Sequence, residues 1–119
     1  MKVLIASMLL GLVAAVPAAG GEPLACNMLA LSKAERATHA KVMRKMAEAV
    51  QETKELKDGY AFRLPPDALV TTSEWVALES RCCPFFRFEM ELASQGGPLW
   101  LRIRGAEGVN AFIRAELGL

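Results

Sequence analysis

The sequence predicts a small single α+β domain in which helices pack on one face of a mainly antiparallel three-stranded sheet. Two patterns predict this class. Apolar residues recur with helical spacing over residues 32–56, and large apolar residues occupy every second position over residues 60–64, 86–92 and 99–104. The predicted element order is helix, strand, helix, strand, strand, helix. A chain of 119 residues that is 53% hydrophobic fits one folded domain and excludes a disordered chain.

Residues 1–20 have the pattern of a cleavable signal peptide. Lys2 supplies the positive charge, and residues 3–16 form an apolar run of the length expected for a signal core. That run is shorter than the roughly 20 residues that a spanning helix needs. Small residues occupy the positions required for cleavage after Gly20. We therefore expect an exported domain, periplasmic or secreted, made of residues 21–119 with no membrane span after cleavage.

A second way of processing this segment is lipid attachment. Pro23, Leu24, Ala25 and Cys26 weakly resemble a bacterial lipobox in which Cys26 would carry the lipid. A lipobox needs leucine three residues before the cysteine, where Pro23 stands, and the apolar run ends too early. The sequence therefore disfavours a lipoprotein.

The first predicted helix begins at a capping box. Ser32 and Glu35 have the Ser-x-x-Glu spacing in which side chain and backbone cap each other. The helix is predicted to run to about Leu56, where Lys57 and Asp58 lead to Gly59, a residue suited to a left-handed cap. Its apolar positions follow one side of the helix and are Ala34, Val42, Met43, Met46, Ala47 and Val50.

The remaining elements follow from alternation and turn residues. A strand over residues 60–64 is stopped by two prolines, and a second Thr-x-x-Glu-like cap at residues 71–74 predicts a helix over residues 72–82. Residues 86–92 and 99–104 alternate on either side of a Gly-Gly turn, which predicts a hairpin. The last helix is expected over residues 106–116.

Charge and composition exclude several functions. The chain has 14 Lys and Arg against 13 Asp and Glu, a net charge of +1, and it lacks the basic excess of a nucleic-acid-binding protein. Its single histidine, His39, lies inside a predicted helix, so a hydrolytic triad is not expected. No catalytic residue is predicted, and the sequence does not identify a protein partner.

The adjacent cysteines are the most unusual feature. Cys82 and Cys83 end the second predicted helix directly before Pro84. A residue before proline is pushed out of helical geometry, so both sulfur atoms are expected to face one point. His39 lies on the first helix, on the same stripe as Met43 and two further apolar residues.

Together these residues predict a metal site. Cys26, His39, Cys82 and Cys83 would form a Cys₃His set, which zinc binds tetrahedrally. Thiolates near a methionine would instead suit copper(I). The sequence therefore predicts an exported protein that binds a thiophilic metal ion, in a structural or metal-handling role.

Two other interpretations stay open. Cys26 can pair with Cys82 or Cys83 as a structural disulfide, which an oxidising compartment favours and which leaves one thiol over. The protein would then be a disulfide-stapled interaction module without metal. In the third interpretation one cysteine is a redox nucleophile, although the carboxyl end of a helix disfavours a thiolate there.

The motif around the cysteine pair also resembles a known family. Residues 79–88, followed by residues 97–101 and 105–109, are similar to small bacterial proteins that carry a Glu-Arg-x-Cys-Cys-Pro-Phe signature. Ser80 stands here where that signature has arginine. The resemblance covers Cys26 to Leu119 and implies no reaction. It does imply that the two adjacent cysteines belong with Cys26 and His39.

Overall fold

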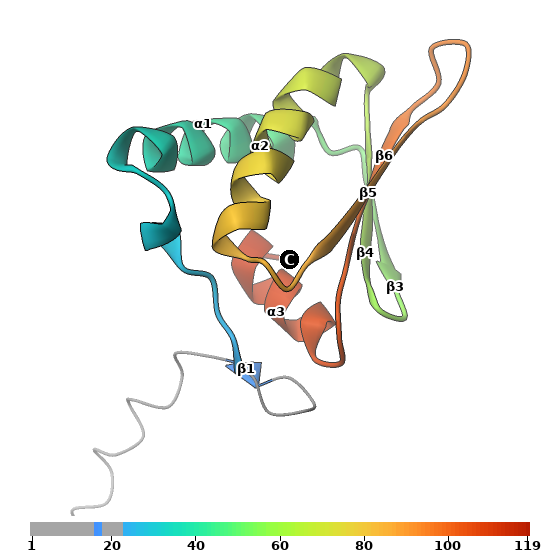
Figure 1. Ribbon diagram of the computed structural model, residues 1–119. Coiled ribbons are helices and arrows are strands. Elements are labelled where there is room, and N and C mark those ends of the chain that lie inside the picture. The colour runs from blue at the N-terminus through green and yellow to red at the C-terminus, as the bar shows by residue number, and fades with distance from the viewer. Residues whose placement is uncertain (1–15, 18–22) are drawn as a thin grey trace, which may run out of the picture.

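The structure, a computed structural model, describes residues 16–17 and 23–119 (Figure 1). Two short segments near its beginning, β1 (Val16–Pro17) and β2 (Pro23–Leu24), pair antiparallel. Nearly all of the predicted signal segment, residues 1–20, lies outside the described residues. Signal cleavage therefore stays a prediction.

The centre of the fold is a four-stranded sheet. Its strands are β3 (Glu52–Leu56), β4 (Gly59–Leu64), β6 (Leu99–Arg104) and β5 (Arg87–Leu92), in that spatial order. Each neighbouring pair is antiparallel. The α+β class and the antiparallel sheet are confirmed, but the predicted sheet of three strands lacked β3.

Three helices cover one face of this sheet (Figure 1). They are α1 (Lys33–Ala49), α2 (Leu69–Cys82) and α3 (Val109–Leu117). Two short 3₁₀ helices, η2 (Met28–Ala30) and η3 (Pro66–Ala68), precede α1 and α2. The element order is thus α-β-β-α-β-β-α and differs from the predicted order by one strand. No helix in the described part of the chain is long and apolar enough to cross a membrane.

The missing strand was predicted as the end of the first helix. Helix α1 ends at Ala49, and residues 57–58 form the turn of the β3–β4 hairpin. The residues of β3 are mostly good helix formers, but pairing with β4 outweighs that local preference. Gly59 is needed because a Cβ there would overlap the carbonyl oxygen of Ile103 in β6, and not because it caps a helix.

The other helix starts also differ from the sequence prediction. Helix α2 begins at Leu69 after a 3₁₀ turn, so residues 71–74 lie inside it and do not cap it. Thr72 is buried, and its hydroxyl has no hydrogen-bond partner within the described chain. Helix α3 begins at Val109, three residues later than predicted, after a turn.

The capping box of α1 is confirmed. The Ser32 hydroxyl accepts from the backbone N–H of Glu35 at 3.1 Å, and the Glu35 carboxylate accepts from the N–H of Ser32 at 2.8 Å. This cap defines the residue at which α1 begins, and therefore which of its residues face α2. The core between helices and sheet is formed by Val42, Met46, Phe62, Leu64, Trp75, Leu99, Leu101, Ile103 and Ile113.

Candidate metal centre

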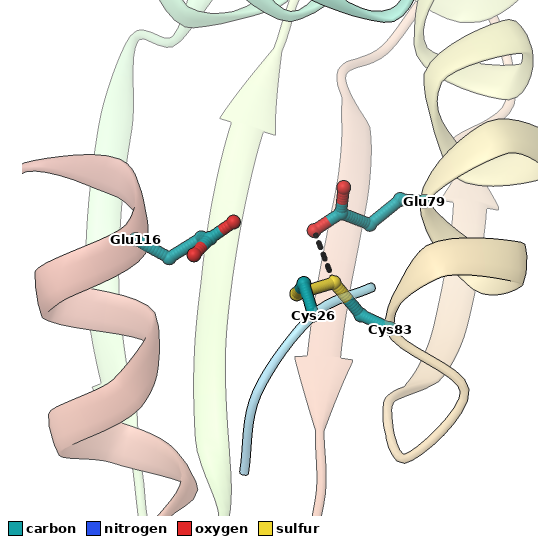
Figure 2. A group of neighbouring side chains, drawn as sticks. All are labelled: Cys26, Glu79, Cys83 and Glu116. Carbon is teal, nitrogen blue, oxygen red and sulfur yellow. Dashed lines mark hydrogen bonds between the residues drawn. A yellow bond between two sulfur atoms is a disulfide. The ribbon is translucent and has the colours of Figure 1, made fainter. Parts of the chain in front are cut away.

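The candidate site lies where the carboxyl end of α2 meets three other segments (Figure 2). Glu79, Cys82 and Cys83 come from the last turn of α2 and the residue that caps it. Cys26 comes from the extended segment before α1, and Figure 2 shows Glu116 pointing toward them from α3. His39 reaches the same place from α1, because α1 and α2 pack side by side.

Cys26 and Cys83 form a disulfide. Their Cα atoms lie 4.6 Å apart, and 57 positions of sequence separate them. Beside the bond, the backbone N–H of Asn27 donates to the carbonyl of Cys82 at 2.7 Å. The structure therefore contains the pairing that the sequence left open between Cys82 and Cys83, and Cys82 is the remaining thiol.

A second clamp holds the same segments together. Arg81 donates to both carboxylate oxygens of Glu35, at 2.7 and 3.1 Å, and to the carbonyl of Ala30 at 3.1 Å. The hydrogen bonds from Arg81 and from the Ser32 backbone lower the pKa of Glu35 to about 2. Arg81 therefore makes its hydrogen bonds at the surface and makes none to the buried Glu79.

Glu79 occupies the centre of the site. It is only 1% exposed, and its Oε1 lies 2.6 Å from Nε2 of His39, itself 5% exposed. Its Oε2 lies 3.4 Å from the sulfur of Cys83. A carboxylate so deeply buried requires close polar partners, and Glu79 finds an imidazole and sulfur atoms.

Cys82 is a fully buried thiol beside this carboxylate. Its sulfur lies 3.7 Å from Glu79 Oε1 and 3.9 Å from the sulfur of Cys83. Burial, followed by the charge of Glu79, raises the pKa of the Cys82 thiol to about 11. The thiol therefore stays protonated near neutral pH unless a cation replaces the proton, which argues against a free nucleophile.

A second carboxylate approaches from α3. The pKa of Glu116 is raised, first by burial and then by the negative charge of Glu79, while His39 acts in the opposite direction. Glu116 is partly exposed, as is Cys26, so both lie at the outer side of the cluster. Two carboxylates this close repel each other, and a cation between them would relieve the repulsion.

Within the described residues, these side chains make two overlapping groups with ligand geometry. One consists of Cys26, Glu79, Cys83 and Glu116, and the other of His39, Glu79 and Cys82. The ligand atoms within each group lie within 4.8 Å of one another. Glu79 belongs to both groups, so they form one continuous cluster from the partly exposed side to the interior.

All four sequence-predicted ligands lie in this cluster, divided between its two groups. Cys26 and Cys83 are joined as a disulfide, whereas His39 and Cys82 face Glu79. Met43 and Met46 instead pack against the hydrophobic core and belong to neither group.

Sequence reasoning missed both glutamates. Glu79 precedes the two cysteines by three and four residues, a spacing that places all three on one side of a helix. This spacing could have identified Glu79 from the sequence. Glu116 carries no such signal, because only the tertiary structure brings α3 to this place.

The chain was also compared with known proteins. No protein-family model, curated protein or solved structure matches it. The function proposed below accordingly rests on the geometry of the chain's own residues.

Proposed function

We propose that this protein is an exported domain that binds a thiophilic metal ion, with His39, Glu79 and Cys82 as its buried ligands. One observation carries the proposal: three different donor groups from two helices lie within 4.8 Å of one another, and all three are buried. The signal-like segment and the presence of a disulfide both support export.

The donor types favour zinc while the disulfide is formed. Imidazole, carboxylate and thiolate are the three kinds of protein ligand that zinc binds. Copper(I), which prefers soft sulfur ligands, would find a single thiol in this state. Glu116 at the partly exposed side of the cluster is placed to guide a cation inward or to supply a further oxygen.

The charge balance of the cluster supports the same conclusion. Glu79 and Glu116 bring two carboxylates together, and His39 is the only basic side chain hydrogen-bonded to either in the described chain. A divalent cation would neutralise this excess and stabilise the Cys82 thiolate. Binding must therefore release the Cys82 proton, so metal affinity should rise with pH.

Elemental analysis and thiol counting test the proposal. The protein is purified from the periplasm without a metal-affinity tag and measured before and after chelation. We expect about one metal ion per chain, and a Cys82 thiol that reacts only after chelation. Glu79→Gln should abolish binding, whereas Glu74→Gln, a change at an exposed position of the same helix, should leave it intact. Failure to bind zinc or copper(I) by the folded wild-type protein would exclude this function.

A second candidate is the disulfide-stapled interaction module. The disulfide and the Arg81 clamp fix the N-terminal segment to α2 without any need for metal. The face of the sheet away from the helices carries Trp100, with the Lys54 ammonium 5.1 Å from the centre of its ring. The same experiment separates the candidates, because this module would be metal-free and its stability would not respond to a chelator.

A further inference from the structure

Reduction of one bond would change the proposed metal centre, and this inference rests on the proposed function. We propose that the Cys26–Cys83 disulfide is a redox gate: while it is closed, Cys82 is the only sulfur ligand, and when it is reduced, Cys83 becomes a second one. The Cys83 sulfur lies 3.9 Å from that of Cys82 and 3.4 Å from Glu79 Oε2.

The distances suit a metal bound by both sulfurs. A disulfide sulfur carries no charge, whereas the thiolate is the form that binds metals. Tetrahedral zinc with bonds of about 2.3 Å to sulfur places two thiolates roughly 3.8 Å apart. The separation of the sulfurs of Cys82 and Cys83 is close to that value. No large backbone movement is therefore needed once the disulfide opens.

Cys26 supplies a further ligand in the same reaction. Its sulfur belongs to the group with Glu79 and Glu116, whose ligand atoms lie within 4.8 Å of one another. Reduction would thus raise the number of available thiols from one to three. A centre of this kind changes from mixed nitrogen, oxygen and sulfur ligands toward sulfur, which favours copper(I) as well as zinc.

Cys26 is partly exposed, whereas Cys83 is fully buried, and this difference defines how the bond would open. A thiolate of a dithiol reductant attacks the sulfur of the more exposed residue, Cys26, and forms a mixed disulfide, and Cys83 leaves with the bonding electron pair. The second thiol of the reductant then attacks its own sulfur in the mixed disulfide and releases Cys26. The reductant becomes a cyclic disulfide, and its two protons pass to Cys26 and Cys83.

The cysteines should remain in place after reduction. The hydrogen bond from Asn27 to the Cys82 carbonyl joins the two segments independently of the sulfurs. Arg81 adds its bonds to Ala30 and Glu35. These contacts keep Cys26 and Cys83 near the cluster, so that after reduction both thiols can bind a metal ion.

Cadmium titration of the wild-type protein tests the gate. The protein is titrated as purified, and again after reduction by a dithiol that is removed under anaerobic conditions. Because the binding free energy of a structural metal site is shared among four ligands, each added thiolate should lower the Kd on the order of 100-fold. We expect at least that decrease on reduction, and a stronger thiolate-to-cadmium charge-transfer band.

Two variants form a matched pair. Cys26→Ser and the double variant Cys26→Ser/Cys83→Ser both lack the disulfide and its covalent constraint, but only Cys26→Ser keeps the Cys83 thiol beside Cys82. We expect Cys26→Ser to bind cadmium about 100-fold more tightly than the double variant without any reductant. Circular dichroism checks that each variant is folded. If either variant is unfolded, the titration of the oxidised and reduced wild-type protein decides whether the gate exists.

The outcomes separate the gate from the proposed function. Equal cadmium affinity of oxidised and reduced protein, with both bound, overturns the gate and leaves the metal centre standing. An absence of binding in both states overturns both proposals. Tighter binding after reduction, with the Cys83 thiol required, supports the gate.

Discussion

Glu79 Oε1 lies 2.6 Å from His39 Nε2, and this contact joins α1 to α2 in the interior of the domain. The single histidine of the chain therefore does not stand alone on an apolar stripe, because it faces a carboxylate from the neighbouring helix. The same carboxylate contacts the sulfurs of both adjacent cysteines. Glu79 is thus the residue through which the helix contact, the free thiol and the disulfide influence one another.

Removing the histidine should destabilise the metal-free protein strongly. His39→Ala leaves the buried Glu79 carboxylate without its nitrogen partner, and breaking such a pair costs about 3–5 kcal/mol. Urea unfolding in the presence of a chelator measures the change. Thr38→Ala, on the adjacent and less buried position of α1, should shift stability by less than about 0.5 kcal/mol. Similar losses for both variants would show that the His39–Glu79 contact has no special role.

The sequence predicted the helices and three strands because their signals are local. The Ser32–Glu35 capping box and the alternation of residues 99–104 need only neighbouring residues to be recognised. Strand β3 has no such signal: Glu52–Leu56 follows α1 closely and consists mostly of helix-forming residues. It becomes a strand because β4 offers it a pairing edge, and that edge exists only in the folded chain.

Opening the disulfide should lower stability without unfolding the domain. Cys26 and Cys83 close a loop with a sequence separation of 57, for which chain entropy gives about 4 kcal/mol. Urea unfolding of oxidised and reduced protein, both with chelator, should differ by about 3–4 kcal/mol. Addition of zinc to the reduced protein should restore part of that loss. A difference below about 1 kcal/mol would mean that the loop is already constrained by other contacts.

The buried thiol should make stability depend on alkaline pH. The Cys82 pKa is about 11 in the folded protein against an ordinary value of 9.0, so folding favours the protonated form. That stabilisation is complete below pH 9.0 and is lost as pH rises to about 11. The loss amounts to at most about 2–3 kcal/mol.

The alkaline prediction is checked by urea unfolding at a series of pH values. Cys82→Ala removes the titrating group, so its stability should change less than that of the wild type between pH 9.0 and about 11. The readout is the slope, because the variant also loses packing atoms and starts from a lower stability. If the stability of both proteins changed with pH in parallel, the pH dependence would not come from the Cys82 thiol.

The close approach of two strands at Gly59 should tolerate no side chain. A Cβ at this position overlaps the carbonyl oxygen of Ile103, and backbone atoms cannot move aside as a flexible side chain would. Gly59→Ala should therefore cost at least about 2 kcal/mol. Gly96→Ala is the control, because nothing lies within 4 Å of a Cβ there and only its positive φ of 71° opposes the change, at about 1 kcal/mol. Thermal unfolding of the two variants gives the comparison.

The residues of the candidate site could be predicted from the sequence only where they are adjacent or of a rare type. Cys82 and Cys83 stand out as an adjacent pair, and His39 and Cys26 were assigned to the same site because the chain has few histidines and cysteines. Glutamate is common on helix surfaces, so neither Glu79 nor Glu116 stood out by type. The choice between Cys82 and Cys83 as disulfide partner depends on where the chain turns after α2, which spacing alone does not define.

We expect Glu116 to lower the stability of the metal-free protein while it favours metal binding. Burial and the charge of Glu79 raise its pKa, so the folded protein favours the neutral carboxyl. Its contribution to stability is therefore complete below its ordinary pKa of 4.5 and is lost as pH rises through the higher folded value. At neutral pH the ionised Glu116 consequently costs stability, and Glu116→Gln should stabilise the metal-free protein by up to about 1 kcal/mol.

The gain from Glu116→Gln should disappear near pH 4, where the wild-type residue is neutral as well. The same substitution should weaken zinc binding, because it removes one negative charge from the partly exposed side of the cluster. Thermal unfolding at both pH values and a zinc titration measure the two effects, with the exposed Glu107→Gln as control. A variant that gains stability at neutral pH and binds zinc less tightly would show that Glu116 is maintained for the cation at the expense of the fold. Unchanged zinc affinity together with greater stability would confine the metal centre to His39, Glu79 and Cys82.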